Sequence, residues 1–252
     1  MIIKKTPEEV EKMAASGAIL VRCLRILASK TRAGTTTEEL DAAAEKFIRS
    51  QGAEPAFKGY RGFPGSICAS PNSMVVHGIP GGYQLKRGDV LSIDVGVIKD
   101  GWVSDAAITV PVGPVSAEAQ KLLDVTKASL FAGVEQMRPG NHLGDVSAAI
   151  QKAVEIEGLS IIRTLVGHGI GRDMHEEPQV PNFGEPGKGP ELEEGMVLAI
   201  EPMVNAGGPL VRMGDDGWSV YSEDGSLAAH FEFTVAVTPQ GPRVLTPWHE
   251  AD

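Results

Sequence analysis

The sequence is poor in cysteine, in aromatic residues and in positive charge. Its 252 residues include only two cysteines, Cys23 and Cys68, so the disulfide framework of a small secreted domain is excluded. Lys and Arg number 23 against 33 Asp and Glu, a formal charge of -10, which leaves no basic surface for nucleic acid or anionic lipid. No apolar run approaches the roughly 20 residues of a membrane span, and the N-terminus lacks the apolar core of a signal peptide. These absences predict a soluble, cytoplasmic protein that binds neither nucleic acid nor membrane.

The chain is nevertheless rich enough in apolar residues to bury a sizeable core. Hydrophobic residues make up 42% of it and charged residues 22%, which is typical of a globular protein. No linker or low-complexity segment interrupts it, so we predict a single domain over residues 1–252. No heptad pattern or apolar stripe indicates an obligate partner, and we expect a monomer.

Helical and strand patterns alternate along the chain in a recognisable order. The capping-box sequence Thr6-Pro7-Glu8-Glu9 predicts a first helix, and Thr37 begins a second that runs to about Ser50. Residues 53–86 are rich in Gly and Pro and predict loops and short strands. Two strands, 90–97 and 103–110, follow around a turn at Lys99-Asp100-Gly101. Two further helices are predicted over about 116–137 and 143–157.

The second half of the chain repeats the first. Arg32-x-Gly34 returns as Arg138-x-Gly140, at an offset of 106 residues. Gly88-Asp-Val-Leu-Ser-Ile-Asp94 returns as Gly195-Met-Val-Leu-Ala-Ile-Glu201, at an offset of 107. Two nearly equal offsets predict a duplicated α+β fold, with halves of about 1–113 and 114–252 that share one sheet and one core.

Four acidic residues interrupt aliphatic strands, where a charge is costly unless it is compensated. They are Asp94, Asp105, Glu201 and Glu232. Any one of them alone is better explained by a buried Arg partner or a capped backbone amide. Four such acids, two of them at matched positions in a duplicated half, favour a metal site. Asp94 and Asp105 flank a turn centred between Lys99 and Asp100, so we expect them to face each other directly across a hairpin.

Three histidines lie in settings that suit a ligand or a catalytic group. His77, His168 and His175 stand in glycine-containing or acidic loop sequences, although a hydrogen-bonded loop histidine explains each one singly. Four carboxylates and one neutral imidazole carry a charge of −4, which two divalent ions balance, so the sequence predicts a dinuclear site with bridging carboxylates. We assign His142, His230 and His249 to structural or surface roles. No CxxC, HExxH or GxSxG motif is present to support a structural zinc, a zincin or a serine hydrolase.

Several motifs together resemble the type I methionine aminopeptidases, within the wider pita-bread metallopeptidase group. The resemblance covers essentially the whole chain and rests on the following segments: Asn72-x-x-x-x-His77-Gly-Ile-Pro80, Ile93-Asp94-Val95-Gly96, Gly167-His168-Gly-Ile-Gly171, His175-Glu-Glu-Pro178, Ile200-Glu201-Pro202 and Phe231-Glu232. It implies a pita-bread α+β fold, in which two pseudo-symmetric halves surround a mainly antiparallel sheet and meet at a metal pair. The resemblance therefore points to type I, and we expect neither the helical insertion of type II enzymes nor the extra N-terminal domain usual in prolidase and aminopeptidase P.

The resemblance also implies roles for individual residues. Two divalent ions (Co, Mn, Fe or Zn) would be bound by five ligands, with a bridging hydroxide that attacks the first peptide bond of a nascent protein. Glu201 would also be the general base, His175 would stabilise the oxyanion and His77 would position the substrate amide. A pocket for the methionine side chain would include Phe57, Tyr60, Phe63, Cys68 and Trp218 together with Met174, His77 and His175. A transient association with the ribosome would fit this role. The five implied metal ligands are Asp94, Asp105, His168, Glu201 and Glu232.

The sequence departs from the family pattern near the predicted pocket. Met174 stands where an aromatic residue is common, Phe57 where a smaller residue is common, and Gly96 where a threonine is usual. Ser73 and Phe233 replace a usual acid and a usual histidine. None of these changes removes a predicted ligand, so two alternatives stay open beside methionine release. One is a dinuclear aminopeptidase with an altered or broader preference, including the Xaa-Pro type, and the other is a non-catalytic binding module on the same fold.

Overall fold

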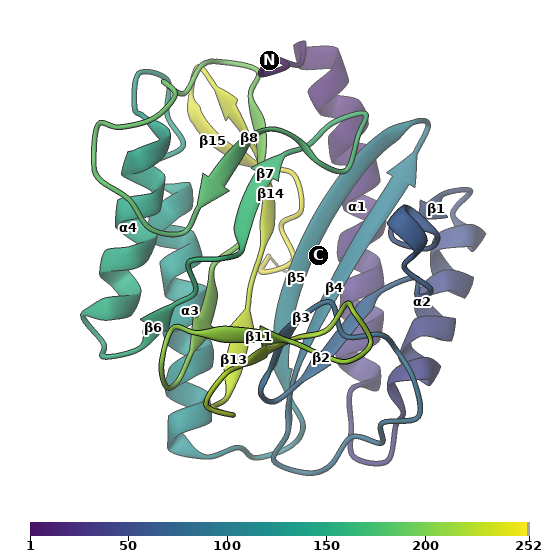
Figure 1. The fold of residues 1–252 in the computed structure, drawn as a ribbon. Helices are drawn as coiled ribbons and strands as arrows, with labels where there is room; N and C mark the ends of the chain where they lie inside the picture. Colours follow the sequence, from purple (N-terminus) through teal and green to yellow (C-terminus); the bar gives the residue numbers. More distant parts are fainter. Residues whose placement is uncertain (251–252) are drawn as a thin grey trace.

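The computed structural model of the protein describes residues 1–250, and its helices follow the predicted order. α1 (Pro7–Lys30) and α2 (Thr37–Ser50) precede the long strands of the first half, and α3 (Ala117–Val134) and α4 (Leu143–Glu155) precede those of the second. Figure 1 shows the first helix pair on one side of the strands and the second pair on the other side. The division into halves at residue 113 and the single-domain assignment stay predictions.

The helix starts agree with the local capping signals in the sequence. Thr6 and Thr36 each form a capping box with the glutamate three residues later, which satisfies two amide donors of each first turn. The Ser116 side chain accepts from Ala119 N at the start of α3. The predicted C-terminal ends are too long, since α3 ends at Val134 instead of Met137 and α4 at Glu155 instead of 157.

Every strand pairing within residues 1–250 is antiparallel. One sheet joins β1 (Glu54–Pro55), β4 (Val90–Lys99) and β2 (Cys68–Pro71), with β5 (Trp102–Pro111) paired to β4. A five-stranded sheet has the order β15-β14-β9-β7-β8, and two three-stranded sheets have the orders β13-β10-β6 and β11-β12-β3. The remaining strands are β3 (Met74–Val76), β6 (Ser160–Ile161), β7 (Val166–Gly169), β8 (Glu176–Pro181), β9 (Val197–Ile200), β10 (Met203–Asn205), β11 (Val211–Met213), β12 (Val220–Ser222), β13 (Ala228–His230), β14 (Phe233–Thr238) and β15 (Gly241–Val244).

The predicted register of the β4–β5 hairpin is wrong by two residues. Lys99 pairs with Trp102, so the turn is Asp100-Gly101, with both residues at positive φ as a tight two-residue turn requires. Asp94 therefore pairs with Ala107, and Asp105 pairs with Gly96. Because side chains alternate along a strand, the two aspartates still lie on the same face, but as diagonal rather than direct neighbours.

Hydrogen bonds tie β5 to the strands of the second half. The Glu232 N–H donates to Ala107 O at 2.9 Å. On one side of this bond, the Thr234 hydroxyl donates to Asp105 O and accepts from Asp105 N. On the other side, the Thr109 hydroxyl donates to His230 O and accepts from His230 N. A threonine of each half thus holds the backbone of the opposite half, next to the acids that the sequence singles out.

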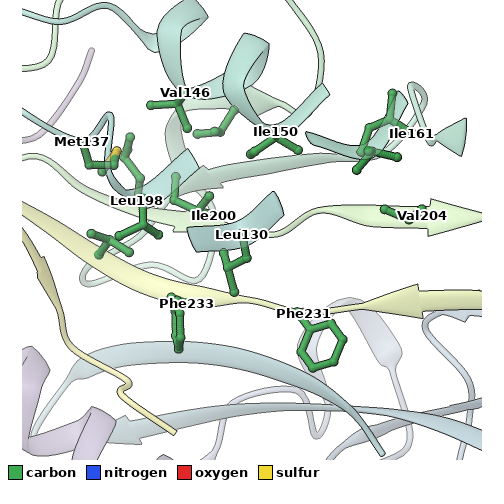
Figure 2. Close-up of a cluster of buried hydrophobic side chains, with 14 of the residues drawn as sticks. Leu130, Met137, Val146, Ile150, Ile161, Leu198, Ile200, Val204, Phe231 and Phe233 are labelled. Atoms are coloured by element: carbon green, nitrogen blue, oxygen red, sulfur yellow. The ribbon is translucent and has the colours of Figure 1, made fainter. Parts of the chain in front are cut away.

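The cores on the two sides consist of helix faces packed on these sheets. In the second half, Leu130 of α3, Val146 and Ile150 of α4 and the β9 residues Leu198 and Ile200 are almost completely buried. Figure 2 shows this cluster, in which Phe231 and Phe233 extend from one strand segment, below Leu130 in this view. The apolar packing fixes the backbone on either side of Glu232 and so its place in the molecule. Among residues 1–250, no helix has the length and apolar character needed to cross a membrane.

Candidate active site

A cavity of about 210 Å³ lies where the strands of the two halves meet, and all thirteen predicted site residues line it. The predicted residues therefore converge in space, although they come from segments up to 175 positions apart. Their roles remain predictions. The cavity residues predicted from sequence are Phe57, Tyr60, Phe63, Cys68, His77, Asp94, Asp105, His168, Met174, His175, Glu201, Trp218 and Glu232.

The four acids form one buried cluster, and within residues 1–250 no Lys or Arg is recorded as an ion-pair partner of any of them. One oxygen each of Asp94, Asp105 and Glu232 is buried and has no hydrogen-bond partner. Burial raises the pKa of Asp94 to about 6 and that of Glu201 to about 7. Burial, followed by repulsion from the neighbouring acids, raises the pKa values of Asp105 and Glu232 well above their usual range. Such a cluster is costly unless a cation compensates it.

His168 lies beside these acids on β7, with its ring fixed by the backbone. Its Nδ1 is 2.9 Å from Gly169 O, so Nδ1 carries the proton and donates it there. Nε2 then faces the acids with its lone pair, 3.6 Å from Glu201 Oε1 and 4.0 Å from Asp105 Oδ2. The preceding Gly167 permits this approach, because a Cβ there would lie 2.3 Å from Ala199 O.

The donor set fits divalent metal ions. Ligand atoms of Asp105, His168 and Glu232 lie within 4.8 Å of one another, and so do those of Glu201, His230 and Glu232. Glu232 belongs to both groups, as a bridging carboxylate would. Carboxylate oxygens and imidazole nitrogens suit hard and borderline ions such as Mn, Fe, Co and Zn. Cys68 belongs to neither ligand group, and burial, followed by the neighbouring acids, raises the pKa of its thiol well above the usual range in the metal-free protein.

His175 and Tyr60 form a second polar pair at the cavity. The Tyr60 hydroxyl lies 2.8 Å from His175 Nδ1, and the two rings stack with centroids 5.4 Å apart. Loss of hydration, and secondarily His168, lowers the pKa of His175 to about 4, so the ring is neutral at pH 7. When the Tyr60 hydroxyl donates to Nδ1, the ring proton is on Nε2. His175 then offers one N–H donor.

The apolar wall of the cavity contains the residues that depart from the family pattern. Phe57 and Met174 are nearly buried, and they meet at Gly96, where an added Cβ would lie 2.7 Å from Phe57 Cε1 and 2.8 Å from Met174 Cε. The missing side chain at Gly96 thus makes room for both. Phe63 and Trp218 complete the wall with an edge-to-face contact, their centroids 5.2 Å apart.

His230 is the functional candidate that the sequence analysis missed. We predicted a structural or surface role for His230. A surface position is wrong, because its side chain is 2% exposed and lines the cavity. Neither ring nitrogen has a hydrogen-bond partner in the part of the chain that the structure describes. His77, which sits at φ 60 and is exposed to solvent, lines the same cavity. The signal in the sequence was the spacing His230-Phe-Glu232, which puts a histidine and an acid on one face of an extended segment.

Comparison with known proteins agrees with this geometry. The sequence profile of metallopeptidase family M24 matches residues 11–239. The chain is 54% identical to the methionine aminopeptidase of Clostridium perfringens, over 98% of this chain and 99% of that protein. It is 50% identical to methionine aminopeptidase 1 of Bacillus subtilis, with the same coverage. The crystal structure of methionine aminopeptidase from Rickettsia prowazekii superimposes with a TM-score of 0.96 at 41% identity, covering 98% of this chain and all of the other.

The structural match confirms the predicted pita-bread α+β fold with its antiparallel sheets. The matched relatives also confirm the resemblance drawn from the motifs. The chain therefore belongs to metallopeptidase family M24 and, within it, groups with the methionine aminopeptidases.

Proposed function

We propose that this chain is a metal-dependent aminopeptidase that removes the N-terminal methionine from new proteins. The observation that carries the proposal is one cavity in which a buried acid cluster, with no Lys or Arg partner among residues 1–250, adjoins an apolar wall of aromatic and sulfur-containing side chains. The whole-length identity to methionine aminopeptidases supports the same activity.

Two divalent ions are proposed as cofactors, with Co, Mn, Fe and Zn as candidates. Asp94, Asp105, His168, Glu201 and Glu232 would hold them. This is supported by the orphaned buried carboxylate oxygens and by the two ligand groups that share Glu232. When bound, the ions supply Lewis acidity and a water of lowered pKa that attacks the first peptide bond.

The protein's own groups would orient the substrate and move its protons. Glu201, whose carboxylate lines the cavity beside His168, would accept the proton of the attacking water. His175 would donate from Nε2 to the carbonyl oxygen as negative charge develops there, with Tyr60 holding its ring. His77, at the exposed edge of the cavity, would hold the substrate amide.

The apolar wall would bind the methionine side chain. Phe57, Phe63, Met174 and Trp218 offer aromatic and thioether surfaces, which suit an unbranched, polarisable thioether. Tyr60 and Cys68 border the same space. Because Met174 is more flexible than the aromatic residue common at this position, a broader preference is the second candidate function.

We further infer that the substrates are nascent-protein N-termini and that the enzyme acts in the cytoplasm. A monomer that associates transiently with ribosomes is consistent with this role. The net charge of -10 supports the absence of nucleic-acid and membrane partners.

Peptide cleavage by the metal-reconstituted protein tests the proposal. Peptides beginning Met-Gly, Leu-Gly and Ala-Pro should be compared with each candidate metal and with a chelated control. We expect metal-dependent release of methionine alone. Release of leucine would indicate a broader aminopeptidase, and release of the residue before proline would indicate the Xaa-Pro type. No cleavage despite two bound ions would favour the binding-module alternative.

A further inference from the structure

Three of the residues that line the cavity are exposed to solvent and therefore mark its opening. They are Arg61, His77 and His175, and the other lining residues are buried or half-buried. At about 210 Å³ the cavity is smaller than the roughly 300–1,000 Å³ pockets that enclose drug-sized ligands. It has room for the first residue of a peptide, and the residues that follow must lie at this opening.

Arg61 carries the permanent positive charge at the opening. It is the only Lys or Arg among the cavity-lining residues of the described chain. Within residues 1–250 its guanidinium has no carboxylate partner. Acidic residues outnumber basic ones by ten in this sequence, so an arginine without an acidic partner stands out. Its charge is available to a group of another molecule.

The loop around Arg61 is closed by its own backbone hydrogen bonds. Gly59 N donates to Phe63 O at 2.8 Å, and Phe63 N donates to Tyr60 O at 2.9 Å. Between them Arg61 adopts φ 50 and ψ 22, the left-handed region that residues other than glycine seldom occupy. Such conformations persist where the surrounding structure holds them, and they concentrate at ligand-binding sites. The loop therefore fixes the backbone of Arg61 at the opening.

The side chain of Arg61 is oriented by Tyr60. Its Cζ lies 5.3 Å from the centroid of the Tyr60 ring, which is a cation–π distance. A guanidinium stacked on a ring keeps N–H groups free in its own plane, where two of them can bind one carboxylate. The Tyr60 hydroxyl lies 2.8 Å from His175 Nδ1, so Arg61 is one side chain away from the group proposed to hold the scissile carbonyl.

We propose that Arg61 is a specificity-determining residue that binds a carboxylate of the substrate a few residues after the first peptide bond. This inference rests on the proposed function, because that function puts the first residue in the cavity and the following residues at its opening. The carboxylate is an Asp or Glu side chain or the C-terminus of a short peptide. Proteins with an acidic residue soon after the initial methionine would be favoured substrates.

Amidated peptides that begin Met-Gly and carry Glu or Gln at the third, fourth or fifth position test this preference. With the metal-loaded unchanged enzyme at low ionic strength, we expect kcat/KM to be about two- to fivefold higher for Glu than for Gln at one or more positions, mainly through KM. Raising the ionic strength should reduce this ratio, because salt screens an exposed pair. Met-Gly-Gly with a free and with an amidated C-terminus distinguishes the main-chain carboxylate from the side chain as the bound group.

Substitutions at Arg61 should change the ratio in a defined order. Arg61→Gln should reduce the Glu-to-Gln ratio to about one, and Arg61→Lys, which keeps the charge, should retain a ratio above one. Arg212→Gln is the matched control. Arg212 is also exposed and stacked on a tyrosine, with Cζ 4.9 Å from the centroid of Tyr221, but it lies outside the cavity lining. Its substitution should leave the ratio unchanged.

The unchanged enzyme would overturn the proposal if it preferred Glu over Gln at no position and also showed no preference for a free C-terminus. So would an equal ratio in Arg61→Gln and the unchanged enzyme. An equal loss of the ratio in Arg212→Gln would also overturn it, because overall charge would then explain the preference.

The failure of the proposed function would be distinguishable from the failure of this inference. If the protein bound two ions but cleaved none of the peptides, the proposed function would fail. Calorimetric affinities of the Glu and Gln peptides for the unchanged protein and for Arg61→Gln would then decide whether Arg61 binds the carboxylate. Tighter binding of the Glu peptide that disappears in Arg61→Gln would support it, and equal affinities would overturn it.

Discussion

Two clusters of buried charge in this molecule are built in opposite ways. Near the start of β8, Glu176 accepts from Lys5 Nζ at 2.5 Å and from Arg172 N at 2.9 Å, and both charged side chains are less than 5% exposed. In the cavity, Asp105 and Glu232 are buried to a similar extent, yet the only ion-pair partners found for them within residues 1–250 are histidines.

The difference shows how to tell a structural acid from a functional one. A paired buried charge is compensated inside the chain and needs nothing else. An unpaired acid cluster lowers the stability of the metal-free protein and is retained at positions that bind an external cation. Removing a charge from each cluster should therefore have effects of opposite sign on stability.

Asp105→Asn should have the largest effect on function. We expect loss of metal at one or both positions and a fall in activity of at least about 10³-fold, since Lewis-acid stabilisation contributes several kcal/mol. The metal-free variant should be more stable than the metal-free parent, because one of the mutually repelling buried charges is gone. Elemental analysis and thermal unfolding check both points. Retention of two ions per chain would contradict the assignment of Asp105 as a metal ligand.

Lys5→Met should have the largest effect on stability. It leaves Glu176 buried without its cation, so the free energy of unfolding should fall by about 3–5 kcal/mol, with metal stoichiometry unchanged. Lys4→Met is the matched control, because its pair with Glu193 is about half exposed on both sides and should contribute less than about 1 kcal/mol. Equal denaturant midpoints for the two variants would show that burial does not distinguish these pairs.

The pH dependence of stability should also distinguish the clusters. The pKa values of Asp94 and Glu201 are raised in the folded protein to about 6 and about 7, so the folded state binds more protons than the unfolded state between about pH 4 and pH 7. The stability that these groups contribute is present below pH 4 and is lost as the pH rises to 7. The metal-free protein should melt lower at pH 7.5 than at pH 5, by roughly 3–5 °C from Asp94 and roughly 5–10 °C from Glu201.

Bound metal should remove this dependence, because metal and protons compete for the same carboxylates. Scanning calorimetry with and without a chelator measures the melting temperature across this pH range. In metal-free Asp105→Asn, the melting temperature should fall less steeply as the pH rises. A pH profile identical in the presence and absence of metal would contradict the assignment of these acids to the metal site.

Gly96→Ala should have the smallest effect and should leave both charged clusters intact. Its Cβ would lie 2.7 Å from Phe57 Cε1 and 2.8 Å from Met174 Cε, so both side chains must shift within the pocket at a cost of about 1–2 kcal/mol. We expect a higher KM for methionyl peptides with unchanged metal content. Gly81→Ala, whose added Cβ meets nothing within 4 Å, is the control. Unchanged KM in Gly96→Ala would show that Phe57 and Met174 do not set the pocket.

Much of this protein could be predicted from local sequence patterns. The capping box at Thr6 predicted the start of α1, and the Thr37-Glu38-Glu39 sequence predicted that of α2. The near-equal repeat offsets indicated the duplicated order of elements. Asp94, Asp105, Glu201 and Glu232 were detectable because a charge within an aliphatic strand is costly whatever it packs against. These signals are contained within a few neighbouring residues.

The tertiary structure decided what depends on the relative placement of distant segments. The two-residue turn at Asp100-Gly101 shifted the hairpin register, so Asp94 and Asp105 became diagonal neighbours. The hydrogen bonds of Thr109 and Thr234 across the halves bring His230 and Asp105 to the same cavity. His230 alone looks like an ordinary strand histidine. It becomes a candidate functional residue only in the folded chain, where its ring is buried and its Nε2 lies close to Glu201 and Glu232.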